Sequence, residues 1–147
     1  MPNLPTHRAF VALGSNLAEP EAQVKQAFAA LACLPRTRLL AQSSLYRSAP
    51  VGYAEQPDFI NAVALIATEI AAHDLLQSLL EIERGRGRIR DFRNAPRTLD
   101  LDLLLYGDSM LHEAGLTLPH PRMHERAFVL LPLLEIAPDC VIPGKGQ

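Results

Sequence analysis

The order of two hydrophobic periods along the chain restricts its fold more than any other feature. Apolar residues that alternate, or that form a short continuous run, are typical of strands, and apolar residues at i, i+4 and i+7 are typical of an amphipathic helix. These patterns predict strands at residues 8–14, 37–47, 59–70 and 97–107 and helices at residues 21–34 and 73–85. A final helix is expected from about Glu125 to Leu134. Before that helix, the predicted order is strand, helix, strand, strand, helix, strand.

This order is that of a ferredoxin-like fold, an α+β sandwich in which an antiparallel sheet packs on helices along one face. The apolar stripe of the second helix passes through Leu75 and Leu79 and reaches Glu83. No internal repeat or interior linker interrupts the 147 residues, so we expect a single domain over residues 1–147. Because this fold carries many unrelated functions, the function must be sought in particular side chains.

The composition of the chain argues against several classes of protein. Its net charge of −2 disfavours a general nucleic-acid binder, which needs a basic surface. The longest apolar stretch, FVLLPLL, is far shorter than the roughly 20 residues that span a bilayer, and the N-terminal MPNLPTHRAF lacks the apolar core of a secretion signal. Cys33 and Cys140 have neither metal-ligand nor disulfide-framework spacing, and we expect both to be small buried hydrophobes. These features predict a cytoplasmic protein with no nucleic-acid or membrane partner.

Two aspartates interrupt the leucines of the last predicted strand, RTLDLDLLLYG. Alternate side chains of a strand share a face, so Asp100 and Asp102 should project together, from a face that turns apolar again at Leu104 and Tyr106. The opposite, core face should consist of Leu99, Leu101, Leu103 and Leu105. Two adjacent anions repel each other unless a cation lies between them. Taken alone, such a pair is most often a solvated strand face, and the other interpretation is a site for Mg²⁺.

The segment before this strand, ERGRGRIRDFRNAPR, is rich in arginine. Its six arginines are Arg84, Arg86, Arg88, Arg90, Arg93 and Arg97. A run of charges is usually only a solvated surface, but guanidinium groups match phosphate oxygens in a way that lysine does not. Gly85, Gly87 and Pro96 predict a loop here, where ligand-binding groups concentrate. Because cations that grip a polyphosphate would then adjoin carboxylates that can hold Mg²⁺, the combination indicates phosphoryl transfer.

The segment RNAPRTLDLDLLLYG closely resembles the signature of the 6-hydroxymethyl-7,8-dihydropterin pyrophosphokinases. Further matching motifs occur in the same order as in that family: ALGSNL, SSLYRSAPVG, QPDFINAV and LPHPRMHERAFVLLPLLEIAPD. The resemblance implies an enzyme of folate biosynthesis that transfers pyrophosphate from ATP to the hydroxymethyl group of the pterin, giving AMP and the pterin diphosphate. It also implies two Mg²⁺ ions, held by Asp100 and Asp102. The family's fold agrees with the predicted order of elements, and we expect a monomer.

The same resemblance assigns roles to individual residues. Arg88 and Arg97 match arginines that stabilise the moving phosphoryl charge. Asp102 is a third catalytic candidate, because its carboxylate could take the proton of the attacking hydroxyl group. The implied ATP-binding residues are Glu83, Arg88, Arg90, Arg97, Leu103, His120 and Arg126. The implied pterin-binding residues are Ser48, Val51, Phe59, Asn61 and Phe128, of which the two phenylalanines sandwich the ring.

Taken without the resemblance, these residues differ in how specific they are. Core packing explains Phe59 and Phe128 more simply than a ligand does, and His120 fits an ordinary loop as well as a phosphate contact. Asn61 is more informative, because it is flanked by apolar residues and a buried amide needs a hydrogen-bond partner. An amide offers both donors and acceptors, which suits the edge of a pterin.

Other classes of function stay open on the sequence alone. A ferredoxin-like module that binds a small regulatory ligand would explain the fold but not the arginines and aspartates. A metal-dependent nucleotidyl transferase would use the same acids, but it would release pyrophosphate and leave AMP on its substrate. An RNA-recognition module would need exposed strand aromatics and a basic sheet, and the sequence shows neither.

Overall fold

The computed structural model of the chain describes residues 6–16, 19–48, 58–85, 99–107, 110–113, 116–121, 123 and 127–140. Its strands are β1 (His7–Ser15), β2 (Thr37–Gln42), β3 (Tyr46–Ser48), β4 (Phe59–Thr68), β5 (Asp100–Tyr106), β6 (Leu111–Glu113) and β7 (Leu116–Leu118). Its helices are α1 (Pro20–Ala32), α2 (Ala72–Gly85) and α3 (Ala127–Ile136). Every predicted strand and helix has a counterpart in this order.

The main sheet has the strand order β2-β4-β1-β5, with β3 also paired to β4. All pairings in this sheet are antiparallel. The order places the first strand and the strand before α2 in the middle, as a split βαββαβ chain requires, so the predicted ferredoxin-like α+β fold is confirmed. Among the described strands, β5 lies at one edge of this sheet, where backbone groups need partners from outside the sheet.

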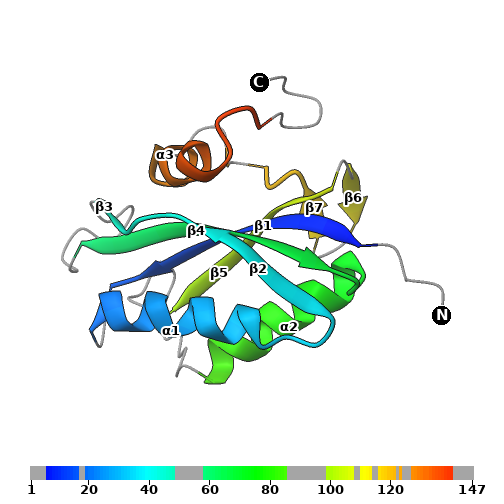
Figure 1. The fold of residues 1–147 in the computed structure, drawn as a ribbon, viewed down its shortest axis with the longest axis horizontal. Coiled ribbons are helices and arrows are strands. Elements are labelled where there is room, and N and C mark those ends of the chain that lie inside the picture. Colours follow the sequence, from blue (N-terminus) through cyan, green and yellow to red (C-terminus); the bar gives the residue numbers. More distant parts are fainter. Residues whose placement is uncertain are drawn as a thin grey trace.

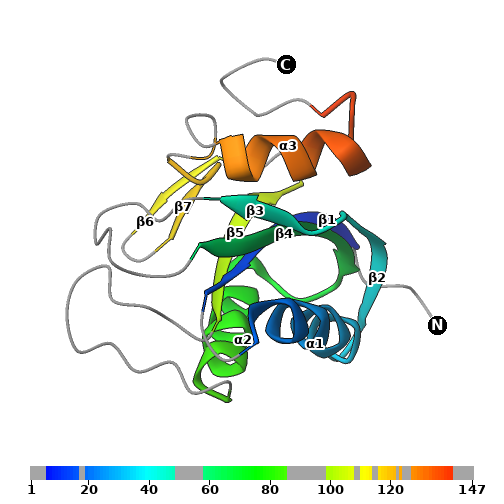
Figure 2. The same ribbon diagram turned by 90° about the vertical axis from the view of Figure 1, so that its left-hand side faces the viewer.

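Helices cover both faces of the sheet (Figure 1, Figure 2). α1 and α2 lie on one face, and α1 buries Val24, Phe28 and Leu31 there, the stripe that its sequence predicts. The sequence predicts helices along one face of the sheet, and this holds for α1 and α2 but not for α3. α3 packs on the opposite face, where its Val129 and Leu133 join a second apolar cluster.

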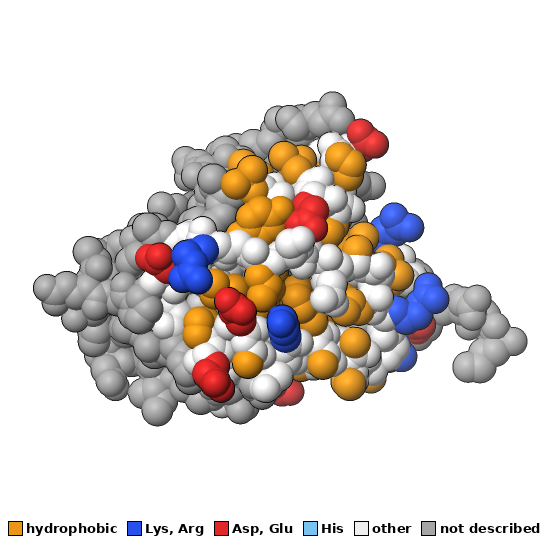
Figure 3. Space-filling view, turned by 60° about the vertical axis from the view of Figure 1, so that its left-hand side comes forward, with side chains coloured by type: hydrophobic (Ala, Val, Ile, Leu, Met, Phe, Trp, Pro, Cys, Tyr) orange, Lys and Arg blue, Asp and Glu red, His pale blue; other side chains and the backbone are white. Residues whose placement is uncertain are grey.

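α3 is apolar on more than one side. Val129 and Leu133 are 3% and 1% exposed, whereas Leu131 and Leu134 are 56% and 47% exposed. Apolar side chains accordingly reach the surface at the top of Figure 3, where α3 lies, and both apolar and charged side chains are scattered over the rest of that face. Packing on the sheet therefore uses only one side of this helix.

The predicted strand over residues 37–47 is interrupted between β2 and β3 at Ser43. The backbone N–H of Ser43 donates to the carbonyl of Val63 at 2.9 Å, and the backbone N–H of Val63 donates to the Ser43 hydroxyl at 2.9 Å. The same hydroxyl donates to the carbonyl of Ser44 at 2.8 Å. Because a side chain here replaces a backbone acceptor, the chain leaves the regular pleat, and β3 continues along β4 as a separate strand.

A bulge in β5 changes the face that its later residues occupy. The pairing with β1 shifts by one position, so that Leu104 is the extra residue. The leucines before the bulge face the predicted core: Leu99, Leu101 and Leu103. After the bulge the alternation is reversed, so Leu105 lies on the α3 side and Tyr106 lies on the side of α1 and α2. The predicted faces of these two residues were therefore wrong.

Smaller features complete the fold. The stretch after β5, which shows no clear period in the sequence, contains the two-stranded β6–β7 sheet. Cys140 is half-buried, but Cys33 is exposed just after α1, so the expectation of two buried cysteines is wrong for Cys33. Within the part of the chain that the structure describes, no helix combines the length and the apolar character that crossing a membrane requires.

Candidate active site

Asp100 and Asp102 share one face of β5, as the period of the strand predicts. Asp100 pairs with Gly14 of β1, and Asp102 pairs with Ala12. Cross-strand neighbours share a face, and Ala12 belongs to the apolar cluster under α3, so both carboxylates lie on the α3 side of the sheet. Both residues are half-buried, and 36% of the Asp102 side chain is exposed. This environment is less open than a solvated strand face, yet it leaves Asp102 accessible to a ligand.

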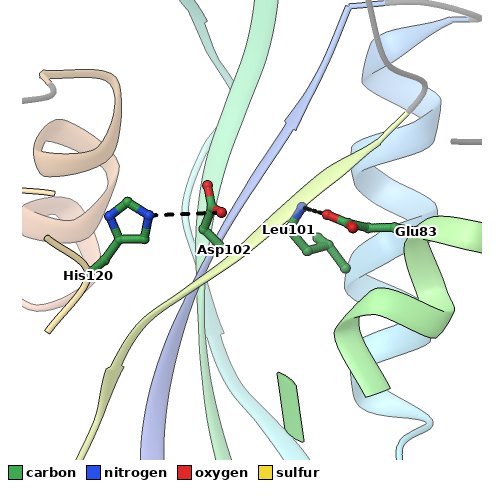
Figure 4. A network of polar contacts seen from close by, with 4 residues as sticks. All are labelled: Glu83, Leu101, Asp102 and His120. Atoms are coloured by element: carbon green, nitrogen blue, oxygen red, sulfur yellow. Dashed lines mark hydrogen bonds and ion pairs between the residues drawn. The ribbon is translucent and has the colours of Figure 1, made fainter. Parts of the chain in front are cut away.

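His120 approaches Asp102 from the segment that follows β7 (Figure 4). Its Nε2 lies 4.0 Å from Oδ1 of Asp102. The backbone holds the histidine in place, because its N–H donates to the carbonyl of Leu104 at 2.9 Å. The carbonyl of His120 accepts the N–H of Met123 at 3.3 Å, and Met123 is completely buried. The structure thus brings a predicted ATP-binding residue next to a predicted metal ligand.

Asn61 lies on β4 in the same row of the sheet as Asp100. Gly14 of β1 separates the two residues, since it pairs with Asn61 on one side and with Asp100 on the other. The Asn61 side chain is 6% exposed, and its Nδ2 donates to Oγ of Ser48 at 2.6 Å. Two predicted pterin-binding residues are therefore in direct contact, and the hydroxyl orients the amide.

Gly14 provides the space into which the Asn61 amide fits. A Cβ at residue 14 would lie 3.2 Å from Oδ1 of Asn61 and 3.9 Å from Cδ1 of Phe59. Asn61 and Asp100 lie on strands that are separated by β1, and neighbouring strands are about 5 Å apart, so about 10 Å separates the backbones of these two residues. A flat ligand held by Asn61 would therefore extend over Gly14 toward the carboxylates.

Glu83 and Leu103, both predicted to contact ATP, lie inside the protein. Glu83 is 1% exposed, and its Oε2 accepts the backbone N–H of Leu101 at 2.6 Å (Figure 4). Leu103 is 4% exposed and belongs to the core between the sheet and the helices α1 and α2. Their contacts with ATP stay a prediction.

Several predicted site residues lie outside the described part of the chain. They are Val51, Arg88, Arg90, Arg97 and Arg126. Phe128 lies in the first turn of α3, where the structure describes the backbone of this residue and not its side chain. Phe59 begins β4 opposite Ser48 and is half-buried. The sandwich of a pterin ring between the two phenylalanines stays a prediction.

A contact that sequence reasoning missed ties α3 to the segment before β4. The Glu135 carboxylate accepts the Tyr46 hydroxyl at 2.6 Å and the Ser44 hydroxyl at 2.9 Å. The backbone N–H of Ser44 lies 3.1 Å from each carboxylate oxygen of Glu135. The hydrogen bond from Tyr46, followed by those from Ser44, lowers the pKa of Glu135, and the same tyrosine bond raises the pKa of Tyr46. We call these three residues the Glu135 clamp; its only signal in the sequence is a lone acid near the end of an apolar helix.

The donor set on β5 fits Mg²⁺ that arrives with a polyphosphate. Among the described residues, no three His, Cys, Asp or Glu side chains gather into a group that could hold a metal by itself. Mg²⁺ commonly takes only one or two carboxylates and completes its coordination with phosphate oxygens and water. Asp100 and Asp102 supply such a pair of oxygen ligands, and the remaining ligands would come from the nucleotide.

Comparison with known proteins agrees with this arrangement. Residues 10–138 match the family model described as 7,8-dihydro-6-hydroxymethylpterin-pyrophosphokinase. The chain belongs to this family. The part of the chain that matches this family includes the strands β4 and β5, most of β1 and the whole of α3. Every described residue of the site therefore lies within the match.

Relatives in the pyrophosphokinase family are similar over nearly the whole chain. A protein of Pseudomonas aeruginosa named 2-amino-4-hydroxy-6-hydroxymethyldihydropteridine pyrophosphokinase is 53% identical over 92% of this chain and 84% of its own length. A Haemophilus influenzae protein of the same name is 49% identical over 93% of this chain and 86% of its own length. The folic acid synthesis protein fol1 of Schizosaccharomyces pombe is 38% identical over 95% of this chain, which corresponds to 19% of fol1.

Proposed function

We propose that this chain transfers the pyrophosphoryl group of ATP to the hydroxymethyl oxygen of 6-hydroxymethyl-7,8-dihydropterin, giving AMP and the pterin diphosphate in folate biosynthesis. Membership of the pyrophosphokinase family over residues 10–138 supports this reaction. The structural observation that carries the proposal is the row Asn61, Gly14, Asp100 across three adjacent strands. A pterin bound at Asn61 would extend toward phosphates bound at the aspartates.

Asp100 and Asp102 are the residues that would hold Mg²⁺, with two ions implied by the resemblance to the family. When bound, Mg²⁺ would neutralise phosphate charge and orient the triphosphate. Two carboxylates on one face of a strand, two residues apart, support this assignment. His120, whose Nε2 lies 4.0 Å from Asp102, would then contact the phosphates beside the same carboxylate.

The reaction needs alignment more than covalent chemistry from the protein. The hydroxymethyl oxygen attacks the β-phosphorus of ATP, the bond from that phosphorus to the oxygen shared with the α-phosphorus breaks, and AMP leaves with that oxygen. Most of the rate enhancement should come from positioning the two substrates and from stabilising the moving charge. We assign the charge stabilisation to Arg88 and Arg97. Asp102 is the candidate acceptor of the hydroxyl proton.

The remaining assignments follow the resemblance residue by residue. The residues proposed to bind ATP are Glu83, Arg88, Arg90, Arg97, Leu103, His120 and Arg126. The residues proposed to bind the pterin are Ser48, Val51, Phe59, Asn61 and Phe128. The contact of Asn61 with Ser48 at 2.6 Å supports the second set, because it holds a hydrogen-bonding amide in a fixed orientation at a nearly buried position.

Identification of the nucleotide product tests the proposal. The purified protein is incubated with ATP, Mg²⁺ and the hydroxymethyl pterin, and the products are identified by mass spectrometry. AMP together with the pterin diphosphate is the expected result. ADP would indicate transfer of a single phosphate, and free pyrophosphate with AMP on the pterin would indicate nucleotidyl transfer; either result would overturn the proposal.

We also propose that the chain forms a single-domain, cytoplasmic monomer. The two apolar clusters on opposite faces of one sheet support a single domain, since both faces use residues of β1, β4 and β5. Light scattering during size-exclusion chromatography tests the monomer, and fractionation of cells tests the location.

A further inference from the structure

Glu83 is a buried carboxylate that lies directly behind the strand of the proposed metal ligands. Its side chain is 1% exposed, on the same side of α2 as the completely buried Leu75 and Leu79. Glutamate is almost never fully buried unless it is paired, because removing a carboxylate from water is costly. An apolar residue at this position would leave the buried N–H of Leu101 without this acceptor. The carboxylate therefore serves the backbone of β5 and not only the packing of α2.

The N–H that Glu83 accepts belongs to the outer edge of the sheet. β5 ends the described strand order β2-β4-β1-β5, and the N–H of Leu101 points away from β1 toward Glu83 (Figure 4). In an antiparallel strand, successive residues direct their backbone groups to opposite sides. Asp100 and Asp102 therefore direct theirs toward β1. Between these two residues, the backbone of β5 is anchored by the carboxylate of Glu83.

Glu83 and the proposed metal site lie on opposite sides of β5. Figure 4 shows Asp102 turned toward His120 on one side and Glu83 approaching Leu101 from α2 on the other side. The hydrogen bond from Leu101 to Glu83 measures 2.6 Å between nitrogen and oxygen, which is short for an N–H donor. Leu101 is joined to Asp100 and to Asp102 by one peptide unit each, so a contact that fixes the backbone of Leu101 also restricts the backbone of both aspartates.

We propose that Glu83 is a positioning residue for the metal-binding carboxylates. It fixes the edge strand at Leu101, so that Asp100 and Asp102 keep the spacing and direction with which they hold a divalent cation that also binds the polyphosphate of a nucleoside triphosphate. The inference rests on the proposed function, since it takes the two aspartates as the metal ligands. It gives Glu83 a role through the backbone of β5, in addition to the contact with ATP that the resemblance implies.

Two replacements of Glu83 separate its hydrogen bond from its volume. Glu83→Gln keeps a weaker acceptor, and Glu83→Leu fills the space without one. Glu81→Gln is the matched control, because it removes an exposed carboxylate from the same helix. The first measurement is amide hydrogen exchange in the protein without metal or nucleotide. Exchange of the Leu101 amide should be fastest in Glu83→Leu, while the amides of β4 keep their protection.

The second measurement is the affinity for Mn²⁺ in the presence of a non-hydrolysable ATP analogue. Electron paramagnetic resonance of the Mn²⁺ ion is the readout. Groups that hold metal ligands in place typically contribute 10–100-fold to metal affinity, so Glu83→Leu should lower Mn²⁺ affinity by about 10-fold or more. A neutral acceptor makes a weaker hydrogen bond than a charged one, so Glu83→Gln should lower the Mn²⁺ affinity by about 2- to 5-fold. Glu81→Gln should bind Mn²⁺ like the wild type. In the Glu83 variants, the metal-free affinity for the analogue should fall by a smaller factor than the affinity for Mn²⁺.

Unchanged Mn²⁺ affinity in both Glu83 variants would overturn the inference. So would a loss in metal-free binding of the analogue that accounts for the whole effect, because Glu83 would then act through the nucleotide alone and not through β5. If Glu83→Leu does not fold, Glu83→Gln decides, and wild-type Mn²⁺ affinity in that variant contradicts the inference. Failure of the wild-type protein to form AMP would instead refute the proposed function.

Discussion

Replacing Gly14 by alanine should weaken pterin binding and leave ATP binding unchanged. The new Cβ would lie 3.2 Å from Oδ1 of Asn61, so the amide would have to move by a few tenths of an ångström. Ser48 already holds the other end of that amide at 2.6 Å, and the shift would strain this bond or turn the amide away from the ligand. The expected loss is that of one hydrogen bond, about 0.5–1.5 kcal/mol, which raises the Kd of the pterin by about 2- to 12-fold.

The stability of the Gly14→Ala protein should change little. Glycine in a strand is about 0.5–1 kcal/mol less favourable than alanine, and this gain offsets the steric cost of the shift. Isothermal titration gives the Kd values for the pterin and for an ATP analogue, and thermal unfolding shows whether the variant is folded.

A double-mutant cycle with Asn61→Ala tests whether the effect passes through the amide. In the Asn61→Ala background, Gly14→Ala should have no further effect on pterin affinity. The reasoning is refuted if the loss is equal in both backgrounds, or if a folded Gly14→Ala protein binds the pterin as tightly as the wild type does.

Replacing either proposed metal ligand, Asp100 or Asp102, by asparagine should abolish nearly all AMP formation in a folded protein, because an amide binds Mg²⁺ poorly; near-normal turnover at millimolar Mg²⁺ would contradict the assignment. Glu135→Gln should lower the melting temperature at neutral pH. The clamp, above all its tyrosine, holds the pKa of Glu135 below the ordinary 4.5, so this stabilisation is present above pH 4.5 and is lost as the pH falls through the lowered pKa. The melting temperatures of the variant and the wild type should therefore converge in acid, and a constant difference would count against the clamp. Tyr106→Phe leaves the carbonyl of Ile70 without its donor at 2.5 Å, and urea unfolding should show a loss of about 1–3 kcal/mol; an unchanged free energy of unfolding would mean that the carbonyl finds another partner.

The order of elements and the helix-side core were predictable because they depend on local periods. Leu75, Leu79 and Glu83 follow one another at four-residue intervals, and all three are buried, as the apolar stripe indicates. The shared face of Asp100 and Asp102 follows from the two-residue period of a strand in the same way. The partner of Glu83 does not follow from a period, since the Leu101 N–H belongs to another element, 18 residues further along the chain.

The errors arose where the structure depends on two segments at once. The faces of Leu105 and Tyr106 depend on a bulge in the pairing of β5 with β1, and no pattern within β5 reveals it. The contact between Ser44 and Glu135 joins residues that are 91 positions apart. Ser43 interrupts a strand because its hydroxyl meets a backbone N–H of β4, which becomes evident only when the two strands are placed side by side.

The apolar face under α3 is assembled from strands that are all made before the helix that covers it. Ala12, Val63 and Leu105 come from three different strands and meet in the cluster to which Leu133 of α3 belongs. A ribosome delivers these strands, and both helices of the other face, before it delivers α3. The nascent chain can therefore complete one core while the side of its sheet that carries Asp100 and Asp102 is still open and apolar. A chaperone that binds exposed apolar surface would have its target on this side, and docking of α3 would end that interaction.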